Sequence, residues 1–303
     1  MGAEEGGQGL SRFIDRAAAL VEERRSQICL GLDPDPADLS REAASGDYTG
    51  TTAEQAAAAV SAHCRILIER AGAFCIAVKP QLACFERLGW PGWRALEEVC
   101  EVARDAGLLV IADGKRGDVP VSATAYGQAM VGRTGTPWGE VPGLGADAFT
   151  ANPLLGEDAM EPLVSAAEQA GAGVFFLVRT SNPGAADVQD LSAGDRPLHE
   201  QLARMVAGFG PELAGTESGL SGAGAVVGAT APGHIERLRS LMPDSVFLVP
   251  GVGAQGGRPE ELGPAFGPGR AAAIIAASRS IVGAADPAAA ADELRRAVWD
   301  VSG

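Results

Sequence analysis

The segment 113–118 reads Asp-Gly-Lys-Arg-Gly-Asp and places two carboxylates and an ammonium group within six residues. An apolar run, Leu-Leu-Val-Ile at 108–111, precedes this segment and is typical of a buried strand. Side chains two residues apart on a strand point to the same face, so we expect Asp113 and Lys115 to share one small space. An acid and a base so placed suit proton transfer or the stabilisation of a developing charge.

Lysine is rare in this chain. Lysine and arginine together number 24, and only Lys79 and Lys115 are lysines, so the other 22 are arginines. Each lysine lies at or just beyond the end of an apolar run. Lysine presents a compact ammonium group that can release a proton, which the guanidinium group of arginine does not do. Chance could explain either lysine alone, but the placement of both favours a function.

Polar residues follow most of the other apolar runs as well. Asp33, Lys79, Asn152 and Ser181 each lie at or just after such a run. If the runs are parallel strands, these side chains converge on one edge of the sheet. Taken singly, Asp33, Asn152 or Ser181 could equally be helix N-caps.

A glycine-rich segment at 250–257 follows the seventh apolar run, and Ser278-Arg279-Ser280 follows the eighth. Glycine-rich loops offer backbone N–H groups to a phosphate, and an arginine on the neighbouring strand adds a cation. Alone, the glycine-rich segment would more often be a tight turn. Together with Arg279 it predicts a phosphate site.

A fixed ammonium group beside fixed carboxylates suits a reaction that builds negative charge on carbon and then protonates it. A buried ionic network can also be purely structural, but strand-end positions favour a function. A Schiff-base aldolase could use Lys79 or Lys115, although neighbouring carboxylates raise the pKa of an ammonium group and so oppose a nucleophilic amine. A Mg²⁺-dependent enolate enzyme could use Asp33 and Asp113 as ligands, but Lys115 would compete with the metal.

The histidines and cysteines suggest no site. The spacing of His63, His199 and His234 matches neither a zinc-protease motif nor a Ser-His-Asp triad, and we expect them at the surface. The five cysteines form no C-x-x-C pair, which argues against a disulfide framework and a zinc site. They are expected to be reduced and buried.

Apolar runs alternate with alanine-rich helical patterns, which indicates a parallel sheet. The predicted strands are 27–32, 74–79, 108–113, 146–150, 174–179, 223–227, 245–249 and 272–278. The predicted helices are 10–25, 52–71, 92–106, 119–132, 158–170, 198–208, 234–242 and 286–301, with only a short turn at 259–266. Eight such units predict a (β/α)₈ TIM barrel of the α/β class, with an open doubly wound sheet as the alternative.

No domain boundary is evident, so residues 1–303 are expected to form a single domain with a flexible tail at 1–9. Three Gly/Pro-rich stretches, 35–50, 132–145 and 208–222, are expected to be surface loops. The net charge of −15 makes nucleic acid and anionic membranes poor partners. With no apolar span that could cross a bilayer, a cytoplasmic protein is expected.

Several motifs together resemble orotidine 5′-phosphate decarboxylase, in particular the longer bacterial type with an Asp-x-Lys-Arg-Gly-Asp motif. The similarity runs through Gly31-Leu32-Asp33-Pro34, Val78-Lys79-Pro80-Gln81, the 113–118 segment, Asn152-Pro153, the 179–184 segment Arg-Thr-Ser-Asn-Pro-Gly, the 250–257 segment and Ser278-Arg279-Ser280-Ile281. It covers nearly the whole chain.

The resemblance implies a TIM-barrel homodimer that converts orotidine 5′-phosphate to UMP and CO₂, without cofactor or metal. It implies that Lys115 protonates C6 of the pyrimidine, that Asp113 lies against the departing carboxylate, and that Asp118 and Ser122 reach into the partner's site. The implied substrate contacts are Asp33, Lys79, Asn152, Ser181, Pro250, Gln255, Gly256, Ser278 and Arg279. Arg116 is assigned no chemistry. The alternatives are a Mg²⁺-dependent sugar-phosphate lyase or aldolase of the same superfamily and a nucleotide-phosphate sensor.

Overall fold

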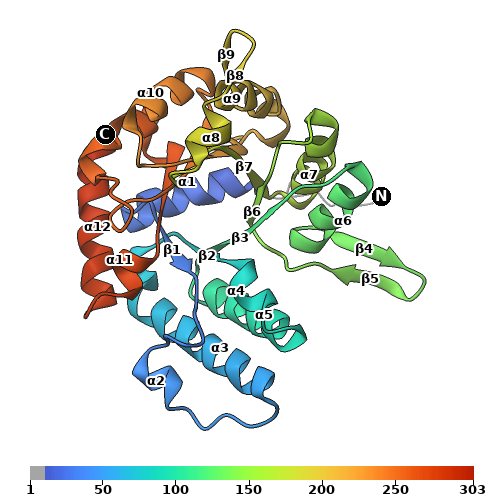
Figure 1. The fold of residues 1–303 in the computed structure, drawn as a ribbon, viewed down its shortest axis with the longest axis vertical. Coiled ribbons are helices and arrows are strands. Elements are labelled where there is room, and N and C mark those ends of the chain that lie inside the picture. Colours follow the sequence, from blue (N-terminus) through green and yellow to red (C-terminus); the bar gives the residue numbers. More distant parts are fainter. Residues whose placement is uncertain (1–10) are drawn as a thin grey trace, which may run out of the picture.

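Eight parallel strands form a closed barrel at the centre of the molecule (Figure 1). The computed structural model describes residues 11–303, so the expected tail at 1–9 lies outside the described residues. The barrel strands are β1 (Ile28–Leu32), β2 (Ala77–Pro80), β3 (Leu109–Arg116), β6 (Ala148–Ala151), β7 (Gly173–Arg179), β10 (Ser221–Val227), β11 (Ser245–Pro250) and β12 (Ala273–Ala277). Each strand pairs with the next barrel strand along the chain, and β12 pairs with β1. The predicted (β/α)₈ barrel is confirmed, and the open-sheet alternative is wrong.

Helices surround the barrel (Figure 1). The main ones are α1 (Phe13–Arg24), α3 (Thr52–Ala71), α5 (Trp90–Asp105), α6 (Pro120–Met130), α7 (Glu157–Ala170), α9 (Leu198–Gly208), α10 (Pro232–Leu241) and α12 (Pro287–Val301). Local sequence sets their starts: Thr51 and Glu54 form a capping box at α3, and Asp286 accepts N–H groups at α12. Between β11 and β12 the chain makes only short 3₁₀ turns, at Pro259–Glu261, Gly263–Phe266 and Arg270–Ala272, in line with the short turn predicted at 259–266.

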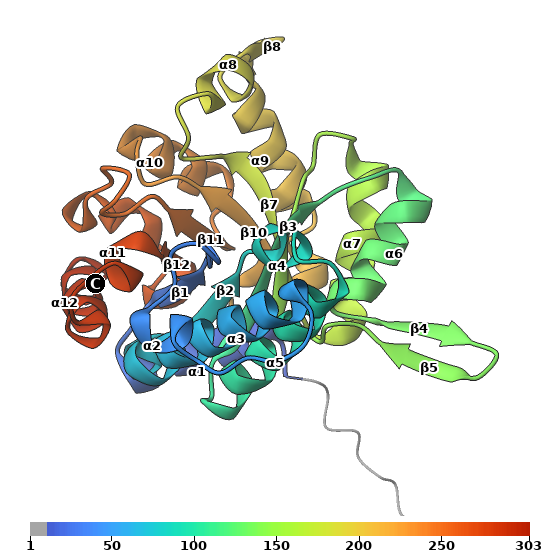
Figure 2. The same cartoon turned by 60° about the horizontal axis from the view of Figure 1, so that its bottom comes forward.

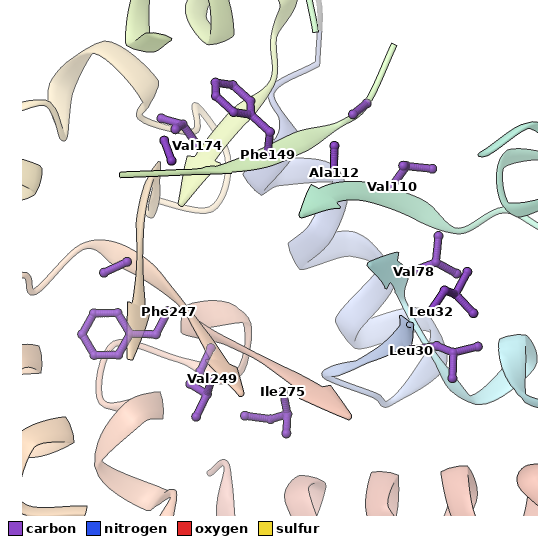
Figure 3. Packing of buried hydrophobic residues seen from close by; sticks show 14 of the residues in the cluster. Leu30, Leu32, Val78, Val110, Ala112, Phe149, Val174, Phe247, Val249 and Ile275 are labelled. Carbon is purple, nitrogen blue, oxygen red and sulfur yellow. The ribbon is translucent and has the colours of Figure 1, made fainter. Parts of the chain in front are cut away.

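Two apolar layers hold the barrel together. The outer layer lies between strands and helices, and Figure 3 shows its side chains, such as Leu30, Phe149 and Ile275, pointing away from the barrel centre. The inner layer fills the barrel and includes Phe175, which meets Phe13 of α1 edge to face at 5.9 Å. Strands buried on both faces carry continuous apolar runs, which explains why the sequence pattern located them.

The three expected surface loops contain structure that the sequence analysis missed. Residues 133–142 form the hairpin of β4 (Arg133–Thr136) and β5 (Gly139–Pro142), which projects from the barrel near α6 and α7 (Figure 2). The 35–50 stretch holds α2 (Arg41–Ala44), and the 208–222 stretch holds the 3₁₀ turn Pro211–Leu213 and the start of β10. After β7 the chain adds α8 (Ala185–Gln189) and the small hairpin of β8 (Ser192–Ala193) and β9 (Arg196–Pro197).

The prediction of surface histidines is wrong for two of the three. His63 is buried, and its Nδ1 accepts the backbone N–H of Ser40 at 3.0 Å. His199 is also buried, while His234 is half-buried. Each buried ring contacts a polar group outside its own helix, the N–H of Ser40 for His63 and the carbonyl of Gln189 in α8 for His199, and the spacing of histidines cannot reveal such contacts.

The five cysteines are free thiols, and all except the half-buried Cys84 are buried. Among residues 11–303, no helix is both long enough and apolar enough to cross a membrane.

Candidate active site

A bulge in β3 positions Asp113 and Lys115. The pairing of β3 with β6 runs from Ala112 opposite Phe149 to Arg116 opposite Ala151, so β3 advances four residues while β6 advances two. The two extra residues break the regular alternation that the sequence analysis assumed. Lys115 takes a left-handed conformation with φ of 48°, which is uncommon for a residue other than glycine. Bulges re-aim side chains beside active sites, and this one brings Lys115 and Asp113 into contact.

The Asp113 carboxylate is surrounded by donors. Oδ2 accepts hydrogen bonds from Lys79 Nζ at 2.5 Å and Gln81 Nε2 at 3.3 Å. Oδ1 accepts from Lys115 Nζ at 2.6 Å and from the hydroxyl of Thr150 at 2.8 Å. The Asp113 side chain is only 5% exposed, so its charge is stabilised almost entirely by protein groups.

The two lysines keep Asp113 ionised. Burial by itself would raise the pKa of Asp113, but the ammonium groups of Lys79 and Lys115 and their hydrogen bonds outweigh it and lower that pKa from 3.8 to about 2. Burial also opposes the charge on Lys79, yet the carboxylates of Asp113 and Asp33 raise the pKa of this ammonium group. The site is therefore a fixed array of charges at neutral pH.

The two lysines differ in their access to solvent. The Lys79 side chain is 11% exposed, whereas that of Lys115 is 43% exposed and lines a cavity of about 480 Å³. Lys115 is therefore the cation of the array that a bound molecule can reach most readily.

The cavity lies at the carboxyl ends of the strands, as expected for a TIM barrel. Nine of the residues predicted for the site line it: Asp33, Lys79, Asp113, Lys115, Ser181, Pro250, Gln255, Ser278 and Arg279. They come from six different strand ends, so barrel closure gathers residues spread over most of the chain. A volume of this size is ordinary for a small-molecule site.

Four predicted site residues do not line the cavity: Asp118, Ser122, Asn152 and Gly256. Asp118 Oδ1 accepts the N–H of Val119 at 2.7 Å, and Asn152 Oδ1 accepts the N–H of Leu154 at 3.0 Å. Both contacts are local turn hydrogen bonds of the kind that short polar side chains often make. Arg116 also stays outside, paired with Glu86 and lying over the ring of Tyr126.

Thr180 and Asn182, which flank the predicted Ser181, also line the cavity, and so do Gln81, Thr150 and Gln189, which were not predicted for the site. Strand alternation carried one step beyond Lys79 points to Gln81. Thr150 is the last residue of the predicted strand 146–150, and because threonine is common in strands its type gave no functional signal. Gln189 reaches Thr180 from α8, its Oε1 accepting the Thr180 N–H at 2.8 Å, and this contact depends on a helix that the sequence did not reveal.

The glycine-rich loop after β11 folds closely beside the cavity. Gly251, Gly253 and Gly256 have φ values of 99°, 73° and 93°, which favour glycine. A Cβ at Gly251 would lie 3.0 Å from Ser181 Cβ and 3.3 Å from Gln255 Oε1, so these two polar side chains close around this glycine.

A second polar cluster lies next to α8. Ligand atoms of Asp190, His199 and His234 lie within 4.8 Å of one another. Both carboxylate oxygens of Asp190 already accept hydrogen bonds from Arg179, at 2.8 and 3.0 Å. His199 Nδ1 lies 2.9 Å from the carbonyl of Gln189 and must donate its proton there, because a carbonyl only accepts. A metal would have to displace Arg179 from the Asp190 carboxylate. We therefore assign this cluster a structural role, in which His199 holds the backbone of Gln189 in place.

Comparison with known proteins identifies the family. The model of the "Orotidine 5'-phosphate decarboxylase / HUMPS family" matches residues 26–294. This chain belongs to that family. An orotidine 5′-phosphate decarboxylase of Deinococcus radiodurans is 39% identical over 295 residues, covering 94% of this chain and 98% of the relative. One from Rhodopirellula baltica is 38% identical, covering 89% and 88%.

Solved structures agree with the family assignment. The OMP decarboxylase of Leishmania donovani superposes with a TM-score of 0.74 at 33% identity, covering 96% of this chain and 99% of that one. The similarity therefore extends over the whole barrel and is not confined to the motifs around the cavity.

Proposed function

We propose that this chain decarboxylates orotidine 5′-phosphate to UMP and CO₂, the last step of pyrimidine nucleotide synthesis, and that Lys115 supplies the proton that replaces the lost carboxylate. Family membership and the near-full-length decarboxylase relatives support the reaction. The observation that carries the proposal is the charge array, in which Asp113 is buried between two ammonium groups and one of them, Lys115, faces the cavity.

In the proposed mechanism, the bond between C6 of the pyrimidine and its carboxylate breaks, CO₂ leaves, and the electron pair stays on C6. The ammonium group of Lys115 stabilises that charge and then transfers a proton to C6, leaving a neutral amine that solvent reprotonates. Asp113 lies beside the departing carboxylate and holds Lys115 in place. Because the array forms before substrate arrives, the protein does not have to reorganise during the reaction.

The remaining cavity residues are proposed to hold the parts of the substrate that do not react. Asp33 and Lys79 bind the ribose hydroxyls, and Ser181 and Gln255 contact the pyrimidine. The phosphate is bound by Arg279 and by the loop that includes Pro250 and Gly256, with Ser278 beside it. Binding energy from the phosphate, far from C6, helps to hold the loop closed over the charge array.

We propose that the reaction needs no cofactor or metal. A divalent cation at Asp113 would meet two ammonium groups within hydrogen-bond distance of the carboxylate. The Mg²⁺-dependent lyase or aldolase alternative is not favoured, since the two near-full-length relatives described above are decarboxylases.

We also propose a homodimer with shared active sites. Asp118 and Ser122 lie outside the cavity of their own chain, and exposed apolar side chains flank them, with Val119 53% and Val121 85% exposed. A second copy docked on this face would cover both valines and receive Asp118 in its own site. The five free thiols fit a reducing compartment, and we propose the cytoplasm.

The test is to incubate the purified protein with orotidine 5′-phosphate and to follow the loss of the substrate's ultraviolet absorbance, with and without EDTA. We expect equal rates in both conditions and one UMP formed per substrate consumed. An inactive protein would sink the proposed function, and activity abolished by EDTA and restored by Mg²⁺ would contradict a metal-free mechanism.

A further inference from the structure

We infer that Thr150 is a positioning residue for the decarboxylation, because its hydroxyl fixes both Asp113 and Lys115 across the bulge in β3. The inference rests on the proposed roles of those two residues. It adds to them a group on the neighbouring strand that holds the pair in its working geometry.

The register of β3 and β6 places Thr150 opposite the bulge. It lies between Phe149 and Ala151 on β6, so it is the residue opposite the bulged segment 113–115. Within the bulge, the backbone N–H of Lys115 donates to the hydroxyl oxygen of Thr150 at 2.9 Å instead of to a strand carbonyl. The side chain of Thr150 therefore takes over a hydrogen bond that a regular ladder would have supplied.

The direction of each hydrogen bond is fixed. The Lys115 N–H can only donate, so the Thr150 oxygen must accept from it. The ionised Asp113 carboxylate can only accept, so the single proton of the hydroxyl points to Oδ1, at 2.8 Å. Thr150 is 1% exposed, so its hydroxyl is held by these protein partners and not by bulk solvent.

This arrangement explains how Lys115 keeps an uncommon backbone conformation. Two contacts hold Lys115 at a φ of 48°. Its backbone N–H donates to the Thr150 hydroxyl, and its Nζ donates to Asp113 Oδ1 at 2.6 Å. Strained conformations persist where surrounding contacts determine them from several sides. Without the hydroxyl, both the backbone of Lys115 and the carboxylate of Asp113 lose a partner.

The first comparison uses Thr150→Val, which replaces the hydroxyl by a methyl group of similar size. We expect kcat and kcat/KM for orotidine 5′-phosphate to fall together by about 10- to 100-fold, as for the loss of a hydrogen bond to a charged group in the transition state. KM and the dissociation constant for UMP, measured by calorimetry, should change less than about 3-fold because the binding groups remain.

The second comparison uses Thr150→Ser and Thr150→Ala, which both lack the methyl group and differ only in the hydroxyl. Thr150→Ser should keep kcat within about 3-fold of wild type, while the kcat of Thr150→Ala should be lowered as much as that of Thr150→Val. This pair also decides the matter if Thr150→Val does not fold. A wild-type kcat in Thr150→Ala, or equal losses in the Ser and Ala variants, would overturn the inference.

Ser26→Ala is the matched control. The buried hydroxyl of Ser26 likewise donates to a protein oxygen, Phe74 O at 2.6 Å, and accepts a backbone N–H, from Ile28 at 3.1 Å, but at the opposite end of the barrel. It should lower the melting temperature and leave kcat unchanged. Lys115→Ala distinguishes failure of the proposed function from failure of the Thr150 inference. An inactive wild type or an active Lys115→Ala variant would contradict the proposed function. If these two proteins behave as expected and only the Thr150 variants do not, the role of Thr150 alone is wrong.

Discussion

Replacing Asp113 by asparagine should destabilise the protein by an amount that depends on pH. Asparagine has nearly the shape of the neutral acid and lacks the charge that lies between Lys79 and Lys115. The pKa of Asp113 falls from 3.8 to about 2 in the folded protein, and each pKa unit corresponds to about 1.4 kcal/mol. The ionised carboxylate therefore contributes about 2 kcal/mol to the free energy of unfolding at neutral pH.

The sign of the pH dependence follows from the direction of this change. The pKa is lower in the folded state, so the contribution is fully present above the ordinary pKa of 3.8 and is lost as the pH falls through about 2. The difference in unfolding free energy between wild type and Asp113→Asn should be about 2 kcal/mol at pH 7 and about half of that at pH 3.

The assay is urea denaturation of both proteins at pH 7, 5, 4 and 3, with Asp47→Asn as control. Asp47 is exposed in the loop before α3, so its substitution should change stability by less than about 0.5 kcal/mol at every pH. A difference for Asp113→Asn that stays constant from pH 7 to pH 3, or that is absent at pH 7, would refute the electrostatic account of this site.

Three further predictions concern the phosphate, the segment that follows β3 and the dimer. Arg279→Ala should lower kcat/KM for orotidine 5′-phosphate at least about 10-fold and weaken UMP binding, and unchanged efficiency would count against the phosphate assignment. Gly117→Ala should cost about 1–3 kcal/mol in urea denaturation, because a Cβ would lie 2.6 Å from the carbonyl oxygen of Asn152, and wild-type stability would contradict this. Asp118→Ala and Lys115→Ala should each be inactive, yet their mixture should regain up to about one quarter of wild-type activity through mixed dimers that hold one intact site, whereas no regain would argue against shared sites.

The barrel could be predicted because its strands are short apolar runs between helical patterns. The β3 run at 108–113, for example, is buried on both faces, and burial on both faces leaves a signal that does not depend on distant contacts. The hairpin of β4 and β5 gave no such signal. Its strands are fully or partly exposed and rich in polar residues and glycine, so apolar periodicity could not distinguish them from a loop.

The site could be predicted in part for a similar reason. Lys79, Asp113 and Arg279 follow apolar runs, and barrel closure alone brings strand ends together. Thr150 and Gln189 were missed because their roles depend on a bulge and on a helix beyond β7, neither of which alters the apolar pattern. The same limit applies to His199, which is buried because the chain folds back to place Asp190 and Gln189 beside it.

The central claim is that Lys115 delivers the proton to C6, and Lys115→Arg tests it most directly when compared with Lys115→Ala and wild type. Arginine keeps the positive charge but does not give up a proton, and the 43% exposure of the Lys115 side chain leaves room for the larger group. The account predicts that both variants bind UMP yet lose decarboxylation of orotidine 5′-phosphate by at least about 1,000-fold. Activity of Lys115→Arg within about 10-fold of wild type would contradict it.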